Sequence, residues 1–179
     1  MKQNSVRRLV IAAMCLALGI ALPFLTGQIP EIGNKLSPMH IPVLLCGFLC
    51  GWKYGLIVGL LLPLLRSFLF PMPPLMPTAV AMAFELGTYG FASGLLYRLL
   101  PKKPIFVYVT LLIAMLAGRA VWGLVSYPIY ALCGKTFSLE LFLANAFVNA
   151  VPGIILHIVI IPPVVLALKR AGILKENRI

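Results

Sequence analysis

The stretch "LLPLLRSFLFPMPPLMPTAVAMAFELGTYG", residues 61–90, holds two apolar runs joined by the proline-rich segment "PMPPLMP". Proline lacks a backbone N–H and interrupts helices, so the stretch predicts the end of one membrane helix, a stiff turn and the start of the next. Arg66 and Glu85 are strongly ionic side chains within these runs. An ionised side chain in a bilayer costs at least ~2.5–3.5 kcal/mol, so it usually faces a partner or a cavity. The two charges therefore predict contact with protein or solute rather than lipid.

The composition of the whole chain indicates a membrane protein. The chain has 179 residues, of which 61% are hydrophobic and 11% are charged. Soluble domains carry roughly 25% charged residues, so we expect one all-α integral membrane domain over residues 1–179. Neither a GxxxxGK[ST] nor a GxGxxG motif occurs, so any ATP hydrolysis must come from another chain. The net charge of +11 lies in short clusters between apolar runs, which is typical of topology signals and not of nucleic-acid binding.

The apolar runs predict six membrane helices, at about residues 6–26, 37–51, 55–70, 77–99, 104–130 and 139–168. The first has about 20 residues, enough to cross a bilayer, and more spans follow, so we expect a retained helix and not a cleaved signal peptide. The second and third are short and separated only by "GWKYG", which favours tilted or partly re-entrant helices. The four cysteines match no metal or redox motif and are expected to fill apolar space. We therefore predict neither a metal site nor a cofactor.

Basic residues at the ends of the spans and between them predict the orientation. With the N-terminus in the cytoplasm, eleven of them fall on the inner side and only Lys35 and Lys135 on the outer side. Cytoplasmic loops carry an excess of Lys and Arg, so both termini of this multi-pass protein are expected in the cytoplasm, with the chain in the cell membrane. The eleven inner residues are Lys2, Arg7, Arg8, Lys53, Arg98, Lys102, Lys103, Lys169, Arg170, Lys175 and Arg178.

This orientation gives a depth to each ionic residue inside the spans. Arg66 is expected near the outer end of the third span, Glu85 about 12 Å below the outer surface, and Arg119 at mid to outer depth. Glu85 can pair with either arginine, and the sequence leaves that choice open. One glutamate neutralises only one arginine, and an unpaired buried cation is costly. The surplus charge favours an anionic or carboxylate-bearing solute, with Arg119 the better candidate because it lies deeper.

A polar stripe is predicted along the sixth span. Asn145, Asn149, Gly153 and His157 recur every four residues, so we expect them to share one helix face. The two asparagines are candidates either for ligand contact or for hydrogen bonds between helices. His157 is placed deeper and interpreted as a packing residue. His40 starts the second span and is placed at the outer surface, as a helix-end residue or part of a pocket rim.

Aromatic side chains add candidates for the pocket. Trp122 follows Arg119 by three residues and so lies on nearly the same helix face. Trp122 and Tyr89 are expected either to stack on a ligand ring or to pack against lipid, while Tyr127 suits the membrane interface. The full predicted substrate-binding set is Arg119, Arg66, Glu85, Asn145, Asn149, Trp122, Tyr89 and His40.

The first span carries "AMCLALGIA", residues 13–21, in which Ala13, Ala17 and Ala21 repeat every four residues. Small residues at this spacing flatten one helix face, so that another helix can approach closely. The face serves either packing within the chain or docking of a separate membrane subunit. A small chain without its own ATPase needs such a subunit.

Together these features resemble the substrate-binding S components of energy-coupling factor (ECF) vitamin transporters. The resemblance rests on the six short spans, the Ala-x-x-x-Ala first helix and the string "SPMHIPVLLCGFLCGWKYGLIVGLLLPLLRS", residues 37–67, and it extends to "GRAVWG" and "NAVPG". It implies a six-helix S-component fold that captures a micronutrient from outside, with a lid at about residues 26–36. It also implies a transmembrane coupling subunit, docked at Ala13 and Ala17, and two cytoplasmic ATPase subunits.

Within that family the chain looks most similar to the riboflavin, folate and pantothenate carriers. Pantothenate is the first choice, because it is small, carries one carboxylate and offers amide and hydroxyl groups to Asn145 and Asn149. A stand-alone secondary carrier or channel for a small anion is the alternative, with Glu85 as a proton relay. An enzyme fits less well and no catalytic residue is predicted, because no HExxH or paired-carboxylate pattern occurs and His40 and His157 are placed at opposite ends of the bilayer.

Overall fold

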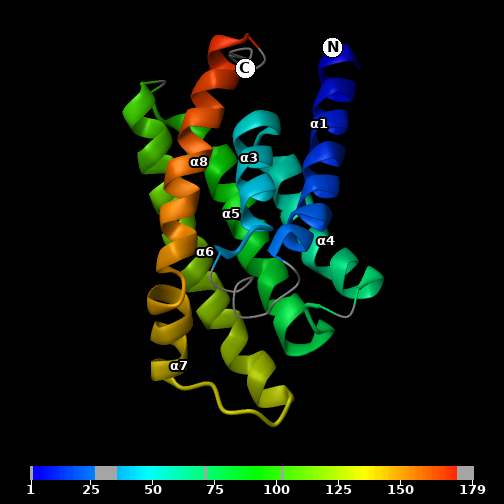
Figure 1. Cartoon of the computed structure of the whole chain (residues 1–179), viewed down its shortest axis with the longest axis vertical. Coiled ribbons are helices and arrows are strands. Elements are labelled where there is room, and N and C mark those ends of the chain that lie inside the picture. Colours follow the sequence, from blue (N-terminus) through cyan, green and yellow to red (C-terminus); the bar gives the residue numbers. More distant parts are fainter. Residues whose placement is uncertain (1, 27–35, 71, 102, 173–179) are drawn as a thin grey trace.

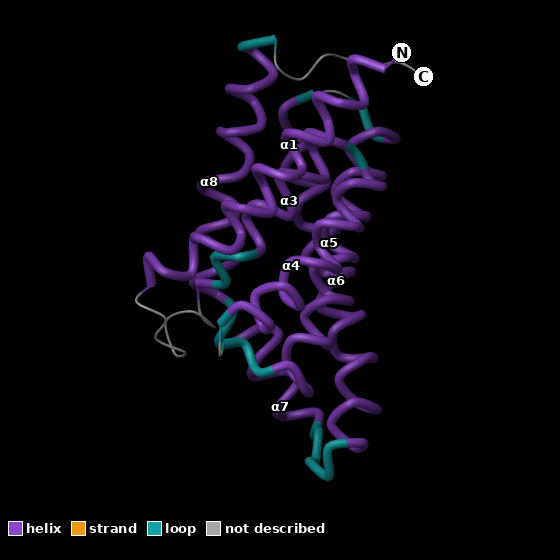
Figure 2. The backbone as a smooth tube through the Cα atoms, turned by 90° about the vertical axis from the view of Figure 1, so that its right-hand side faces the viewer, coloured by secondary structure: helices purple, strands orange, loops and turns teal. Residues whose placement is uncertain are grey.

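The computed structural model describes residues 2–26, 36–70, 72–101 and 103–172, and all regular structure within these ranges is helical. Residues 27–35 of the expected lid lie outside the described residues. The long helices are α1 (Lys2–Ala21), α4 (Trp52–Leu69), α5 (Val80–Leu99), α6 (Pro104–Leu132) and α8 (Val151–Arg170), and α3 (His40–Cys50) is short. Shorter helical turns adjoin them: η1 (Leu22–Thr26), η2 (Leu75–Ala79), α7 (Leu139–Leu143) and η3 (Ala144–Val148). Figure 2 shows how nearly the whole described backbone is helical.

Five of the described helical segments are long and apolar enough to cross a membrane, and they include all the long helices. Large hydrophobic side chains remain exposed along them; Phe68, Leu124 and Val159, for example, are each more than half exposed. Apolar surface of this extent suits lipid and not water. The all-α membrane fold predicted from the sequence is therefore confirmed.

Helix α3 is too short to cross the membrane alone. It contains 11 residues, which span ~16 Å, about half of the ~30 Å hydrocarbon core. The first residue of α3, His40, is 3% exposed. Since α3 begins near the middle of the molecule and runs toward the end that holds both termini without reaching it (Figure 1), its buried first residue lies inside the bundle.

Helices α3 and α5 form the middle of the bundle, with α1 and α4 on one side and α6 and α8 on the other (Figure 1). Two groups of buried side chains follow this arrangement. One group joins α3, α5, α6 and α8 through residues such as Leu44, Leu111 and Ile161. The other joins α1, α3, α4 and α5 and includes Val43 and Leu62, along with three of the four cysteines. The central helices are thus packed on both sides, while the outer ones keep a lipid-facing side.

Glycines allow the backbones of α4 and α5 to touch. A Cβ atom on Gly90 would overlap the Gly55 carbonyl, and one on Gly59 would overlap the backbone around Leu86. Side chains at these positions would force the two helices apart. The contact fixes how α5 is rotated, so that its polar residues Glu85 and Tyr89 meet α3 and α6 instead of α4.

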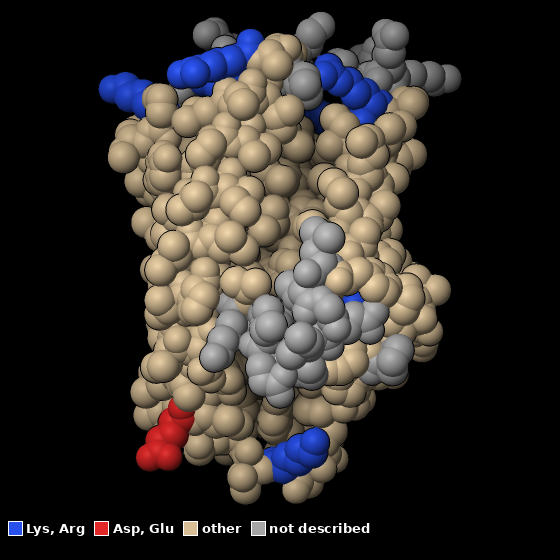
Figure 3. All heavy atoms as spheres, viewed as in Figure 1, with Lys and Arg blue, Asp and Glu red and all other residues tan. Residues whose placement is uncertain are grey.

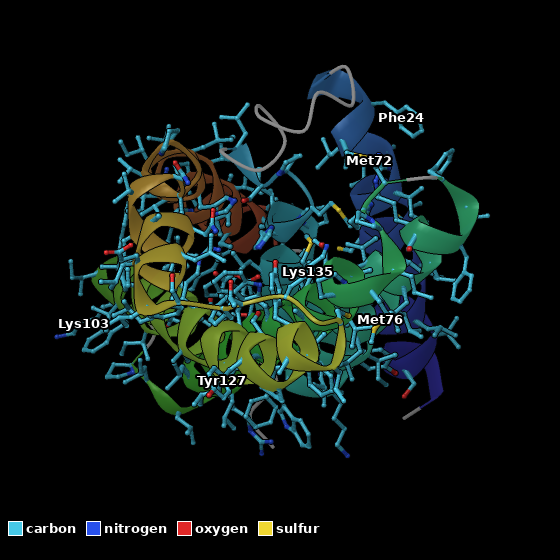
Figure 4. All side chains as sticks on the ribbon, turned by 90° about the horizontal axis from the view of Figure 1, so that it is seen from below. Phe24, Met72, Met76, Lys103, Tyr127 and Lys135 are labelled. Carbon is cyan, nitrogen blue, oxygen red and sulfur yellow. The ribbon has the colours of Figure 1, made fainter. Side chains whose placement is uncertain are left out.

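Basic side chains gather at the end of the molecule where both termini lie (Figures 1 and 3). The start of α1, the α3–α4 and α5–α6 junctions and the end of α8 supply them. The connection between α6 and α7, which carries Lys135, lies at the opposite end (Figures 1 and 4). This separation of charge is the pattern from which the membrane orientation was predicted.

Candidate functional site

Five polar side chains from four helices meet inside the bundle, and we call them the Glu85 cluster. His40 begins α3, Glu85 and Tyr89 lie on α5, Arg119 lies on α6 and His157 lies on α8. Glu85, Tyr89, His40 and His157 are each at most 3% exposed, and the Arg119 side chain is 14% exposed. Glu85 and Tyr89 are four residues apart, so they project from the same face of α5.

The Glu85 carboxylate is held by partners from two helices. Arg119 Nη1 lies 3.0 Å from Glu85 Oε1, and the Tyr89 hydroxyl donates a hydrogen bond of 3.1 Å to the same oxygen. His40 Nε2 lies 3.7 Å from that oxygen, beyond hydrogen-bond distance. A buried carboxylate without a partner is strongly destabilising. The ion pair with Arg119 therefore resolves the choice that the sequence left open between Arg66 and Arg119.

Gly118 places Tyr89 beside Glu85. A Cβ atom on Gly118 would overlap the Tyr89 ring, so the absence of a side chain lets that ring lie directly against α6. The neighbouring residue, Arg119, then reaches Glu85 from the same helix turn. The Gly-Arg sequence thus supplies both the space for the tyrosine and the charge for the carboxylate.

The two histidines are neighbours, and the prediction that they lie at opposite ends of the bilayer was wrong. Their rings stack with centroids 5.9 Å apart, and His40 also lies 5.2 Å from the Tyr89 ring. His157 Nε2 is 3.4 Å from the carbonyl oxygen of Ser37, just before α3. The error arose because His40 was placed at the outer surface, whereas the short helix α3 begins at mid-depth, level with His157.

Four buried nitrogen atoms of the Glu85 cluster have no hydrogen-bond partner in the described structure. They are His40 Nδ1, His40 Nε2, His157 Nδ1 and Arg119 Nε. A buried polar atom without a partner costs about 1–3 kcal/mol. Such a group of atoms is typical of a site that a polar small molecule or water completes.

Arg66 lies in a different environment, where α4 meets the end of α1. It is 2% exposed and donates a hydrogen bond to the backbone carbonyl of Ile20. Its guanidinium carbon lies 5.1 Å from the Phe24 ring centroid and 5.3 Å from that of Phe70. Figure 4 shows Phe24 on the same side of the bundle as Met72, which follows α4. Arg66 makes these contacts instead of an ion pair with Glu85, so it does not add the surplus positive charge beside Glu85 from which an anionic solute was predicted.

The expected polar stripe on the sixth span is interrupted. Asn149 donates a 3.2 Å hydrogen bond to Asn145, but Asn149 is exposed whereas Gly153 and His157 are buried. The π-helical turn η3 contains Asn145, and a turn at residues 149–150 separates it from α8. A π turn carries more residues per turn than an α-helix, so a spacing of four no longer keeps side chains on one face.

The remaining predicted residues lie nearer the surface. Trp122 is half-buried between the rings of Phe137, at 5.6 Å, and Phe142, at 6.1 Å. Ala13, Ala17 and Ala21 are exposed on α1, while Gly19 is buried against Leu62. No group of three His, Cys, Asp or Glu side chains suited to a metal ion occurs among the described residues.

His157 is the member of the cluster that sequence reasoning assigned to packing alone. The length of the second span held a usable clue, because an apolar run of about 15 residues does not cross a bilayer. A histidine at its start was therefore more compatible with mid-depth than with the surface. Nothing in the sequence pairs Glu85 with Arg119 in preference to Arg66.

The family model described as "ECF transporter, substrate-specific component" matches residues 7–165 of the chain. The match covers most of the chain and includes every member of the Glu85 cluster. Neither a curated protein nor a solved structure matches the chain.

Proposed function

The chain belongs to the substrate-specific components of ECF transporters, and on that premise we propose that the Glu85 cluster binds a carboxylate-bearing vitamin, with pantothenate the first candidate. As a family member the chain is a multi-pass membrane protein and a transport subunit that captures substrate for an ECF importer. Membership also implies association with the coupling and ATPase modules of such a transporter.

The proposed orientation has both termini in the cytoplasm and the α6–α7 connection outside. The gathering of basic side chains at the end that holds the termini supports it, because cytoplasmic segments are rich in Lys and Arg. In this orientation the Glu85 cluster lies at mid-depth. The substrate reaches it from the outer side, past Asn145 and Trp122.

The carboxylate proposal rests on which nitrogen atoms of the Arg119 guanidinium have partners. Glu85 occupies Nη1, while the buried Nε has no partner in the described structure. A guanidinium binds carboxylates through paired N–H groups on one edge. Glu85 therefore orients Arg119 and leaves the edge that carries Nε available for a second carboxylate, that of the substrate.

Arg66 is not a surplus cation beside Glu85. A surplus cation beside Glu85 required both arginines, but Arg66 contacts Ile20, Phe24 and Phe70 instead. We assign Arg66 to holding α1 against α4 and Arg119 to the substrate. Tyr89 and His40 complete the inner wall, and Asn145 with Asn149 offers amide groups to the substrate's hydroxyl and amide functions.

The exposed alanines of α1 are the proposed docking face for the coupling subunit. Ala13, Ala17 and Ala21 lie outside the packed bundle, so their small side chains are not used for packing within the chain. Larger exposed residues, Met14 and Leu18, lie beside them. A helix of the partner can approach the alanine row closely.

Ligand identification tests this function. The chain is purified in mild detergent, small molecules are extracted and identified by mass spectrometry, and the identified vitamin is titrated calorimetrically. We expect a carboxylate vitamin whose affinity falls strongly in Arg119→Ala and only slightly in Arg66→Ala. An uncharged vitamin, or affinity unchanged in Arg119→Ala, would contradict the proposal.

A further inference from the structure

We infer that His157 is a specificity residue of this site, which accepts a hydrogen bond from an O–H or N–H group of the substrate through its Nδ1 atom. The inference rests on the proposed function, because it concerns a ligand bound at the Glu85 cluster. It adds a requirement of its own, namely that the substrate carries a hydrogen-bond donor as well as a carboxylate.

The contacts of His157 place it at the opposite end of the cluster from Arg119. The residue is 2% exposed, its ring stacks on His40 at 5.9 Å, and His40 Nε2 lies 3.7 Å from the carboxylate that Arg119 binds. A chain of contacts thus connects His157 to Arg119 through two side chains, His40 and Glu85. A molecule of vitamin size that contacts Arg119 is long enough to contact His157 as well.

The contact with Ser37 fixes the role of each ring nitrogen. The Ser37 carbonyl can only accept, so His157 Nε2, at 3.4 Å, carries the proton and donates to it. In the neutral ring, Nδ1 is then an acceptor. This Nδ1 atom is buried and has no partner in the described structure. A packing histidine would have both nitrogens satisfied, whereas this one keeps an acceptor available inside the cluster.

Arg119 Nε and His157 Nδ1 require opposite hydrogen-bonding groups on the substrate. Arg119 Nε donates and requires an acceptor such as a carboxylate oxygen, whereas His157 Nδ1 accepts and requires a hydroxyl or an N–H group. A simple carboxylate without a donor leaves His157 Nδ1 unsatisfied. The site therefore selects hydroxy- or amide-bearing carboxylates over plain fatty or short-chain carboxylates.

Two substitutions separate ligand contact from packing at this position. In His157→Asn the side-chain oxygen replaces Nδ1 and the contact to Ser37 is lost. In His157→Gln the amide nitrogen reaches the place of Nε2, which keeps the Ser37 contact, and the acceptor at Nδ1 is lost. Calorimetric titration with pantothenate, and thermal unfolding without added ligand, are measured for both variants, for the wild type and for Arg119→Ala.

We expect pantothenate affinity to fall at least about tenfold in His157→Gln and clearly less in His157→Asn, because an unpartnered ligand donor weakens binding by that order. Unfolding without ligand should show the reverse order, with His157→Gln the more stable variant. Equal affinity of wild type and His157→Gln, with binding still dependent on Arg119, would overturn this inference and leave the proposed function intact. If the wild type does not bind pantothenate, that choice of substrate fails. The four proteins are then compared for the amount of the small molecule that co-purifies with the wild type, and an undiminished amount on His157→Gln would overturn the inference.

Discussion

Removing the charge of Arg119 alone should destabilise the protein far more than removing the charges of Arg119 and Glu85 together. Arg119→Met takes away the guanidinium 3.0 Å from Glu85 Oε1 and leaves a carboxylate that is 2% exposed. Removing one partner of a buried ion pair costs about 3–5 kcal/mol. For a chain of this size each kcal/mol lowers the midpoint of thermal unfolding by about 2–4 °C. We therefore expect Arg119→Met to unfold roughly 6–20 °C below the wild type.

The double variant Glu85→Gln with Arg119→Met is the matched comparison. It contains no uncompensated charge, and the substituted amide still accepts the hydrogen bond from the Tyr89 hydroxyl. Most of the lost stability should return, because uncharged replacements of buried ion pairs are often neutral or stabilising. The assay is thermal unfolding of the wild type, Arg119→Met and the double variant in one detergent without added ligand. A single variant as stable as the wild type, or a double variant no better than Arg119→Met, would refute the buried pair as the reason these residues occur together.

Three further substitutions test the fold and the docking face. Arg66→Ala should lower the free energy of unfolding by about 2 kcal/mol, because a charged hydrogen bond is lost. Pantothenate affinity should stay within about threefold of the wild type, and a large loss of affinity would indicate that Arg66 contacts the substrate. Gly90→Ala should cost about 1–3 kcal/mol because its Cβ meets the α4 backbone. Gly87→Ala on the same helix meets only the flexible side chains of Leu60 and Leu56 and should cost less, so equal unfolding midpoints for the two variants would contradict the close contact of α4 and α5. Ala17→Leu should abolish uptake by the assembled transporter without changing substrate affinity. Ala167 is also exposed, and Ala167→Leu should leave uptake intact. Loss of substrate affinity in Ala17→Leu would mean that this face of α1 packs within the chain.

The class of fold and the family could be predicted from the sequence because both depend on local properties. Long apolar runs define membrane helices whatever their partners, and the resemblance to ECF S components is confirmed by the family match over residues 7–165. The presence of Glu85 and Arg119 in such runs was a sound indication of a polar site. What these residues contact depends on how the helices are rotated and at what depth each one starts.

Three features show where the sequence was insufficient. The partner of Glu85 depends on the rotation of α5, which the glycine contacts with α4 fix, and no spacing rule encodes that packing. His40 was misplaced because α3 begins at mid-depth and spans only 11 residues. The asparagine stripe assumed a continuous α-helix, but the π-helical turn η3 and the turn after it displace Asn149 from the face of His157. Each of the three features is a relation between elements and not a property of the residues themselves.

The proposed role of Arg119 is to anchor a substrate carboxylate at the Glu85 cluster. This role is tested by comparing the binding of pantothenate with that of pantothenol, in which a hydroxymethyl group replaces the carboxylate, to the wild type and to the double variant Glu85→Gln with Arg119→Met. Charge-assisted hydrogen bonds contribute about 1.5–3 kcal/mol, so the wild type should prefer pantothenate by roughly 10- to 150-fold, and the double variant should lose this preference. Equal affinity of the wild type for both compounds, or a preference that survives in the double variant, would contradict this role.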